Sequence, residues 1–433
     1  MLIRVLLTLP IALACAGAAV RAEPPPPAAD SIMVDDLVRL ALRDNPELAA
    51  MRAGAAAAAA RPAQARALPD PRFTYGWMGE HLETARGPQS STYSLSQEIP
   101  FFGKRGLMGQ MAERGARASA EQVTAAELGL AAEVRGVAAE LFYVDEALAI
   151  QGEDRRLLED IHDIARTKYT TGTGRLENVA KVEVELAENE KEILNLNRDQ
   201  DVARAEMNRL LGRGPETPLA RITSGPPPGP GATLAPDSLA ALGEARPELR
   251  AAGEAIAASE AAVRLARRSY FPDFMLGGQY YVVEKGMSAS PEAGTDAWML
   301  EFGVNLPIWR QKLGAGVREA RQIEAESRAA RDNERIRIGS EITTAASHVR
   351  RTREIVDVYR DKLIPRAEIA LSSARSGYQS GGVDFLDLLD SERALIAARL
   401  ADAAARADYV KSAADLARAT AQPLPVPIAG VTP

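Results

Sequence analysis

Three aspartates, Asp384, Asp387 and Asp390, recur every third residue directly after a glycine-containing segment, Ser380-Gly381-Gly382-Val383. Residues three apart lie on the same side of a helix, so the spacing predicts one acidic helix face. Such a face can attract cations into a pore or a binding site, or it can be ordinary solvated surface. The pattern alone leaves both interpretations open.

Other reactive side chains are too few or too scattered to form a catalytic or metal site. The only cysteine is Cys15, and the three histidines, His81, His162 and His348, lie far apart in the sequence. The segment Gly103-Lys104-Arg105-Gly106 lacks the spacing of a phosphate-binding loop, and no G-x-S-x-G motif is present. The sequence therefore predicts no enzyme active site, no cofactor and no metal centre. The formal net charge of −7 also argues against a nucleic-acid partner.

The first segment of the chain has the pattern of an export signal. Arg4 precedes an apolar run from Val5 to Val20, and Val20-Arg21-Ala22 fits a signal-peptidase site. We expect residues 1–22 to be a cleaved signal peptide. Lipidation of Cys15 is the alternative, although Ala12 occupies the position where a lipoprotein signal usually has leucine.

The rest of the chain is a duplication. Asn45-Pro46-Glu47-Leu48 recurs as Arg246-Pro247-Glu248-Leu249, 201 residues later, and Tyr169-Thr170-Thr171-Gly172 recurs as Tyr378-Gln379-Ser380-Gly381, 209 residues later. Several matches in the same order indicate two copies of one unit. We expect a first repeat at 31–217, a proline-rich linker at 218–236, a second repeat at 237–421 and a tail at 422–433.

Long helices dominate each predicted repeat. Residues 104–171 contain no proline, which predicts one continuous helix, and residues 175–211 contain neither proline nor glycine. Heptad positions in the second stretch are mostly apolar, as in a coiled-coil seam. They are Val179, Leu186, Ile193, Gln200 and Met207, and Val182, Asn189, Leu196, Ala203 and Leu210. Pro365 predicts a bend in the helix that leads to the second glycine turn.

Each repeat also contains two segments that alternate between apolar and more polar residues, which is typical of outer-membrane strands. The residues expected to face lipid are Phe73, Tyr75, Trp77, Tyr93, Leu95, Trp298, Leu300, Phe302 and Val304. Four strands cannot close a barrel in lipid, because unpaired edge groups are too costly there. Three chains would contribute twelve strands, which is enough to leave a lumen. The predicted fold is mainly α-helical, with long coiled-coil hairpins and four strands per chain in a shared twelve-stranded trimeric barrel.

These features together resemble the TolC-like outer-membrane efflux protein family. The resemblance covers about residues 31–421 and rests on Asn45-Pro46-Glu47-Leu48, Leu68-Pro69-Asp70-Pro71, Gln97-Glu98-Ile99-Pro100 and the two glycine turns. It implies a homotrimeric, non-enzymatic conduit in the outer membrane with a long periplasmic extension. The implied partners are outer-membrane lipids, a periplasmic adaptor and an inner-membrane transporter of the resistance-nodulation-division type. Pro69-Asp70-Pro71 and residues 100–106 look most like the branch that exports heavy-metal cations.

The resemblance also assigns roles to residues near the turns. Thr171, Gly172 and Thr173 in the first turn, and Gly381, Gly382 and Val383 in the second, match tips that dock onto the adaptor. Asp387 and Asp390, with Asp384 beside them, match carboxylates that line a periplasmic gate. The alternatives are a periplasmic helical adaptor or scaffold, and a drug or type I secretion conduit of the same fold.

Overall fold

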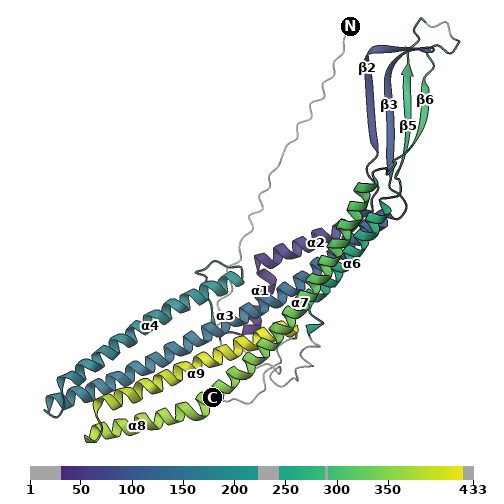
Figure 1. Cartoon of the computed structure of the whole chain (residues 1–433). Coiled ribbons are helices and arrows are strands. Elements are labelled where there is room, and N and C mark those ends of the chain that lie inside the picture. Colours follow the sequence, from purple (N-terminus) through teal and green to yellow (C-terminus); the bar gives the residue numbers. More distant parts are fainter. Residues whose placement is uncertain (1–30, 223–242, 288–290, 423–433) are drawn as a thin grey trace, which may run out of the picture.

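The computed structural model describes residues 31–222, 243–287 and 291–422. The predicted signal peptide (1–22), residues 223–236 of the predicted linker and residues 423–433 of the predicted tail lie outside these ranges. The described chain is long and narrow. A small sheet lies at one end, and two turns that connect helices lie at the other (Figure 1).

The two long helices of the first repeat have nearly the lengths that the sequence predicts. In the first repeat, α1 (Val34–Asp44) and α2 (Pro46–Arg66) precede α3 (Lys104–Thr170) and α4 (Leu176–Leu210). In the second, α6 (Pro247–Arg268) precedes α7 (Arg310–Val358), α8 (Ile364–Ser380) and α9 (Phe385–Thr420). Helix α3 has 67 residues, which corresponds to roughly 100 Å. No helix among the described residues is long and apolar enough to cross a membrane.

The predicted bend before Pro365 appears as a local change of helix type. A π-helical turn, η2 (Tyr359–Leu363), separates α7 from α8. Proline cannot donate a backbone hydrogen bond and crowds the preceding turn, so the regular hydrogen-bond ladder is interrupted there. The chain changes direction between α7 and α8 (Figure 1).

The four predicted strands form one antiparallel sheet with the order β2-β3-β5-β6. Their bounds are β2 (Arg72–Thr84), β3 (Gly87–Ile99), β5 (Phe274–Val283) and β6 (Ala297–Val304). The pairing of β3 with β5 joins the two repeats in the middle of the sheet. A second, two-stranded sheet pairs β1 (Ser31–Ile32) with β4 (Arg221–Ile222) in parallel, so part of the predicted linker is strand.

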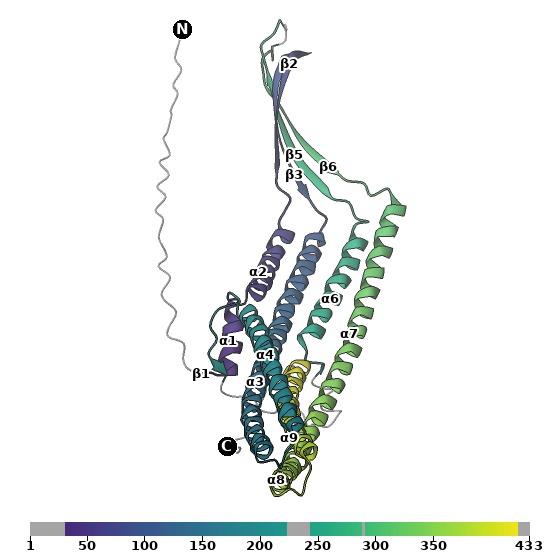
Figure 2. The ribbon, with the colours of Figure 1, turned by 90° about the vertical axis from the view of Figure 1, so that its left-hand side faces the viewer.

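The helices pack around several small cores instead of one large one. One core lies between α1, α3 and α4, another between α6, α7 and α9, and a third joins α3, α4, α8 and α9 close to the turns. All ten predicted heptad residues of α4 are buried or partly buried, which confirms the seam. Helices α4, α3, α9 and α8 lie side by side in that order (Figure 1), and α2, α3, α6 and α7 lie side by side nearer the sheet (Figure 2).

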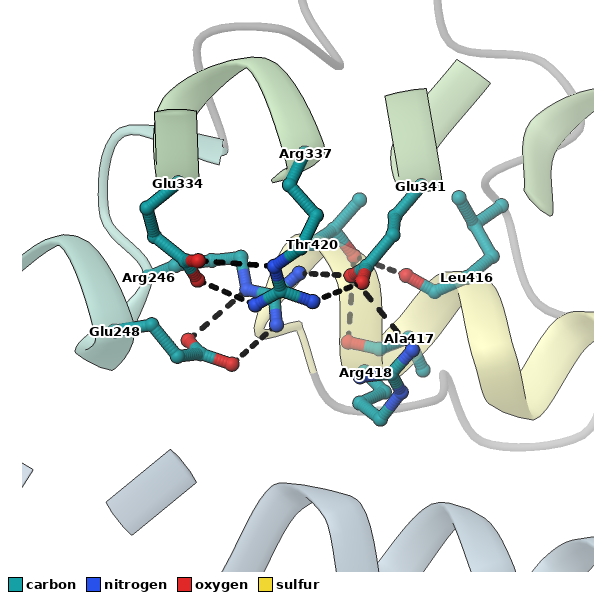
Figure 3. A network of polar contacts seen from close by, with 9 residues as sticks. All are labelled: Arg246, Glu248, Glu334, Arg337, Glu341, Leu416, Ala417, Arg418 and Thr420. Atoms are coloured by element: carbon teal, nitrogen blue, oxygen red, sulfur yellow. Dashed lines mark hydrogen bonds and ion pairs between the residues drawn. The ribbon is translucent and has the colours of Figure 1, made fainter. Parts of the chain in front are cut away.

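The two repeats differ at the duplicated Pro-Glu-Leu motif. Asn45 caps α2: its Oδ1 accepts from Leu48 N at 2.9 Å, and its Nδ2 donates to Leu210 O at 2.9 Å. Arg246 holds the matching place before α6, has 1% of its surface exposed and donates to Glu341 Oε2 at 2.6 Å. It belongs to a network of three arginines and three glutamates that joins α6, α7 and α9 (Figure 3).

Candidate functional site

The end of the molecule opposite the sheet consists of two short turns. The first joins α3 to α4 through Thr171-Gly172-Thr173-Gly174, and the second joins α8 to α9 through Gly381-Gly382-Val383-Asp384 (Figure 1). Gly172 has φ +74° and Gly381 has φ +83°, a backbone conformation that favours glycine. The predicted tip residues therefore lie at the far ends of both hairpins, and each turn needs one of its glycines for backbone geometry alone.

Hydrogen bonds within each turn fix its shape. The carbonyl oxygen of Lys168 accepts from the backbone N–H groups of Thr173 at 2.9 Å and Gly174 at 2.8 Å. In the second turn, Gly382 N donates to Gly377 O at 2.9 Å. A Cβ added at Gly172 or Gly381 would meet no atom within 4 Å, so space remains open at both turns.

Lys168 connects the two turns, which the sequence reasoning did not identify. Its Nζ donates to the backbone carbonyl oxygen of Tyr378. The same Nζ lies 4.3 Å from the centroid of the Tyr378 aromatic ring. The Tyr378 ring is 6% exposed and packs against Phe385, with centroids 5.4 Å apart. Burial raises the pKa of the Tyr378 phenol. The two hairpins are thus held together within one chain just behind their tips.

The three aspartates have different surroundings. Asp384 does not continue the helical face, because α9 starts at Phe385 and Asp384 is its N-cap, with its Oδ1 accepting from Phe385 N at 2.7 Å. Asp387 and Asp390 are exposed and lie one turn apart near the start of α9. Leu388 and Leu389 between them are buried, so the two carboxylates point away from the packed core. Asp390 also pairs with Arg393 at 3.4 Å.

The sheet carries a continuous apolar face. Its register places Tyr75 opposite Tyr93, Tyr93 opposite Tyr280 and Tyr280 opposite Trp298, so one aromatic row crosses all four strands. A second row contains Phe73, Leu95 and Leu300. The nine residues expected to face lipid are 41–73% exposed in the single chain: Phe73, Tyr75, Trp77, Tyr93, Leu95, Trp298, Leu300, Phe302 and Val304. An exposed apolar face that extends across all four strands marks a contact with a membrane or with another protein.

The Gly-Lys-Arg-Gly segment lies where β3 turns into α3. Lys104 is buried, and its Nζ donates to Phe271 O at 2.9 Å and to Asp273 Oδ1 at 2.8 Å. The same Asp273 oxygen accepts from Phe101 N at 2.7 Å. Arg105 Nε donates to Arg66 O at 2.8 Å. These cations therefore bind groups of their own chain, and Lys104 ties the first repeat to the second.

No cluster of ligating side chains capable of holding a metal ion occurs within the described ranges. His162 lies 3.7 Å from carboxylate oxygens of both Asp163 and Glu183, whereas His348 lines a groove between α7 and α9. Neither has the neighbours that a closed metal site requires.

Comparison with known proteins gives the family. The model of the family described as "Outer membrane efflux protein" matches residues 37–213 and 240–422. The cobalt-zinc-cadmium resistance protein CzcC of Cupriavidus metallidurans is 24% identical over 78% of this chain and 77% of its own length. The probable outer membrane lipoprotein SilC of Salmonella typhimurium is 24% identical, over 70% of this chain and 66% of its own length.

A solved structure has the same fold. The crystal structure of CusC superposes with a TM-score of 0.76 over 90% of this chain and 92% of that one, at 19% sequence identity. The family match covers both repeats and most of the described helices and strands. The chain thus belongs to the outer membrane efflux protein family and is a non-enzymatic channel of the outer membrane, with a helical periplasmic extension, that works in a tripartite efflux system.

Proposed function

We propose that this channel is a homotrimer that conducts heavy-metal cations from a periplasmic adaptor and an inner-membrane transporter to the exterior. Support for the substrate class comes from the relatives, since CzcC is named for resistance to cobalt, zinc and cadmium and CusC is described as a cation efflux system protein. The exposed carboxylates of Asp387 and Asp390 add an electrostatic reason, because rings of carboxylates favour cations in a pore. The competing substrates are drugs or secreted proteins.

The open edges of the chain support the trimer. Among the described strands, β2 and β6 each pair on one side only, and unpaired edges are costly in lipid. Pairing β6 of one chain with β2 of the next would close twelve strands around a lumen, with the apolar face toward lipid.

The two sides of the helical portion, α4 on one side and α7 with α8 on the other, carry net charges of opposite sign. Helix α4 carries nine acidic and five basic residues, a net charge of −4. The opposite flank, from α7 through η2 to α8, carries fifteen basic and ten acidic residues, a net charge of +5. Complementary charge favours contact between α4 of one copy and the α7–α8 flank of another, which fits a closed ring.

The aspartates are proposed to form the constriction of the periplasmic end. With threefold symmetry, Asp387 and Asp390 would each supply a ring of three like charges. We expect the Asp387→Ala/Asp390→Ala double variant to lose cation selectivity in planar bilayers. The matched control is Asp408→Ala/Asp415→Ala, which removes the same charge from exposed positions farther along α9. Equal selectivity of the two double variants would reject the constriction.

The tips are proposed to dock onto the adaptor. Gly172 and Gly381 are poor test positions, because their positive φ makes any substitution strain the turn. Gly382 has no such strain, and a Cβ added there would lie 3.9 Å from the nearest atom. We expect Gly382→Trp to abolish adaptor crosslinking while the trimer still inserts into the membrane, whereas Gly54→Trp on α2 leaves crosslinking unchanged. Normal crosslinking of the Gly382 variant would reject docking at this turn.

The substrate is tested in cells. A strain that lacks the channel should become sensitive to cobalt, zinc, cadmium, copper or silver, and complementation should restore resistance. Loss of drug resistance without any change in metal resistance would favour the drug conduit instead.

A further inference from the structure

A layer of buried polar side chains crosses the coiled coil just behind the second turn. Glu392 on α9 is 2% exposed, Asp154 on α3 is 6% exposed and Asn189 on α4 is 4% exposed. Asn189 Nδ2 donates to Asp154 Oδ2 at 3.0 Å and to the Gln151 side chain at 2.7 Å. Glu392 lies within hydrogen-bonding reach of Asp154. Two carboxyl groups are therefore enclosed in the seam that joins α9 to the first hairpin.

This layer leaves one buried carboxylate oxygen without a donor in the described ranges. Asp154 Oδ1 is buried and accepts no hydrogen bond from any donor among the described residues. Ionised carboxylates have no proton to donate, so a hydrogen bond between Glu392 and Asp154 requires a proton on one of them. A negative charge on Asp154 beside Glu392 in this buried site also disfavours ionisation of Glu392.

The charged groups around Glu392 do not replace that proton. Glu185 on α4 adds a further negative charge, and Arg393 on α9 is the cation that lowers the pKa of Glu392. Arg393 binds Glu185 and Asp390 instead of the buried pair. The charged side chains of nearby α8 are engaged elsewhere, with Glu368 paired to Arg399 and Arg375 to Asp160.

The next polar layer along the seam shows the usual solution. There, Arg406 pairs with both Glu146 on α3 and Asp402 on α9, and its Nε lies 2.9 Å from Asp402 Oδ2. One cation thus serves two carboxylates. Among the described residues, no cation bridges Glu392 and Asp154 in this way, and a proton is the remaining positive charge that can bind there.

We propose that Glu392 holds a proton against Asp154 and that the pair acts as a pH-sensitive latch, which keeps the start of α9 against the first hairpin. The latch lies two residues beyond Asp390, so its release would loosen the helix that carries the proposed constriction. Its effect on conductance therefore rests on the proposed position of that constriction. The presence of the proton does not rest on the constriction, because it follows from the burial and contacts of Glu392 and Asp154.

The direction of the pH effect follows from the position of the proton. Burial and the neighbouring Asp154 raise the pKa of Glu392 to about 9. The folded protein thus keeps a proton that the unfolded chain would release near the ordinary pKa of glutamate, so its stabilisation is complete at acid pH. That stabilisation declines as the pH rises and is lost once the pH passes the folded pKa. Alkaline solution should therefore open the latch.

Infrared spectroscopy of the assembled wild-type channel tests the proton directly. We expect a buried carboxylic-acid band at neutral pH that disappears with a midpoint near the raised pKa. The Glu392→Gln variant should lack the band, because glutamine imitates the neutral acid without titrating. Asp154→Asn serves as a second variant in case Glu392→Gln does not assemble. Absence of a titrating band that either variant removes would overturn the proposal.

Conductance in planar bilayers tests the latch. From about pH 7 to about pH 10, wild-type conductance should rise several-fold, while Glu392→Gln should stay low throughout. Glu146→Gln is the matched control, because its layer keeps Arg406 and should follow the wild-type curve. A rise of equal size in Glu392→Gln, or a flat wild-type curve despite a titrating infrared band, would refute the latch. Failure of the constriction itself would appear separately, as unchanged selectivity of the Asp387→Ala/Asp390→Ala variant.

Discussion

Replacing Lys104 by methionine should loosen the junction between the sheet and the helices. Methionine keeps the apolar stem of the side chain but removes the ammonium group that binds both Phe271 O and Asp273 Oδ1. Hydrogen bonds to charged groups contribute about 1.5–3 kcal/mol each. The Asp273 side chain is 36% exposed, so water partly replaces the lost partner. We therefore expect a loss of about 2–3 kcal/mol in the free energy of unfolding per chain.

Denaturant titration of the detergent-solubilised channel, followed by circular dichroism, measures this loss. Arg105→Met is the matched control: it removes the neighbouring cation, whose contact with Arg66 O is exposed, and should cost at most about 0.5 kcal/mol. A double-mutant cycle with Asp273→Asn isolates the ion pair, because asparagine can still accept from Phe101 N. Equal effects of the Lys104 and Arg105 variants, or strict additivity in the cycle, would refute the reasoning.

Three further predictions concern the periplasmic end, each measured by the same titration. Phe385→Ala should lower the free energy of unfolding by about 3–5 kcal/mol, because the ring is 1% exposed and packs against Tyr378; a loss below about 1 kcal/mol would contradict the packing. Asp384→Ala should cost about 1 kcal/mol through the lost N-cap and leave cation selectivity unchanged in planar bilayers. Gly381→Ala should cost about 1 kcal/mol because of its positive φ, whereas Gly382→Ala should be nearly neutral, and equal costs would exclude the strain.

The local elements of this fold could be predicted from sequence because their limits are set by nearby residues. Glycines at 103, 172 and 381 have positive φ and mark helix ends, and the predicted helices 104–171 and 175–211 differ from the observed ones by a single residue at each misplaced end. Alternation of apolar residues identified all four strands. Asp384 was wrongly placed on the helix face, because spacing alone does not distinguish an N-cap from the first helical turn.

Contacts between distant residues could not be predicted in this way. The β3–β5 register depends on residues about 180 positions apart, and no local pattern selects it. The role of Lys168 depends on how two hairpins meet, and its sequence neighbours look like those of any exposed lysine. The buried Glu392–Asp154 pair was hidden for the same reason. A glutamate in a helix ordinarily faces water, and only the packing of α3 against α9 removes this one from it.

The differences between the two repeats bear on how the proposed trimer could assemble. Where both copies keep the same residue type, as in the Pro-Glu-Leu motif and the glycine turns, the shared residues serve the common helix ends. Where they diverge, the changed residues create unlike surfaces. Asn178, the counterpart of Asp387, lies close to the Tyr378 side chain, whereas Asp387 is exposed. The flank of the first repeat is acidic and that of the second is basic. Identical flanks would allow either repeat to pair with itself across chains. In the proposed trimer, opposite flanks favour alternation of first and second repeats around the ring.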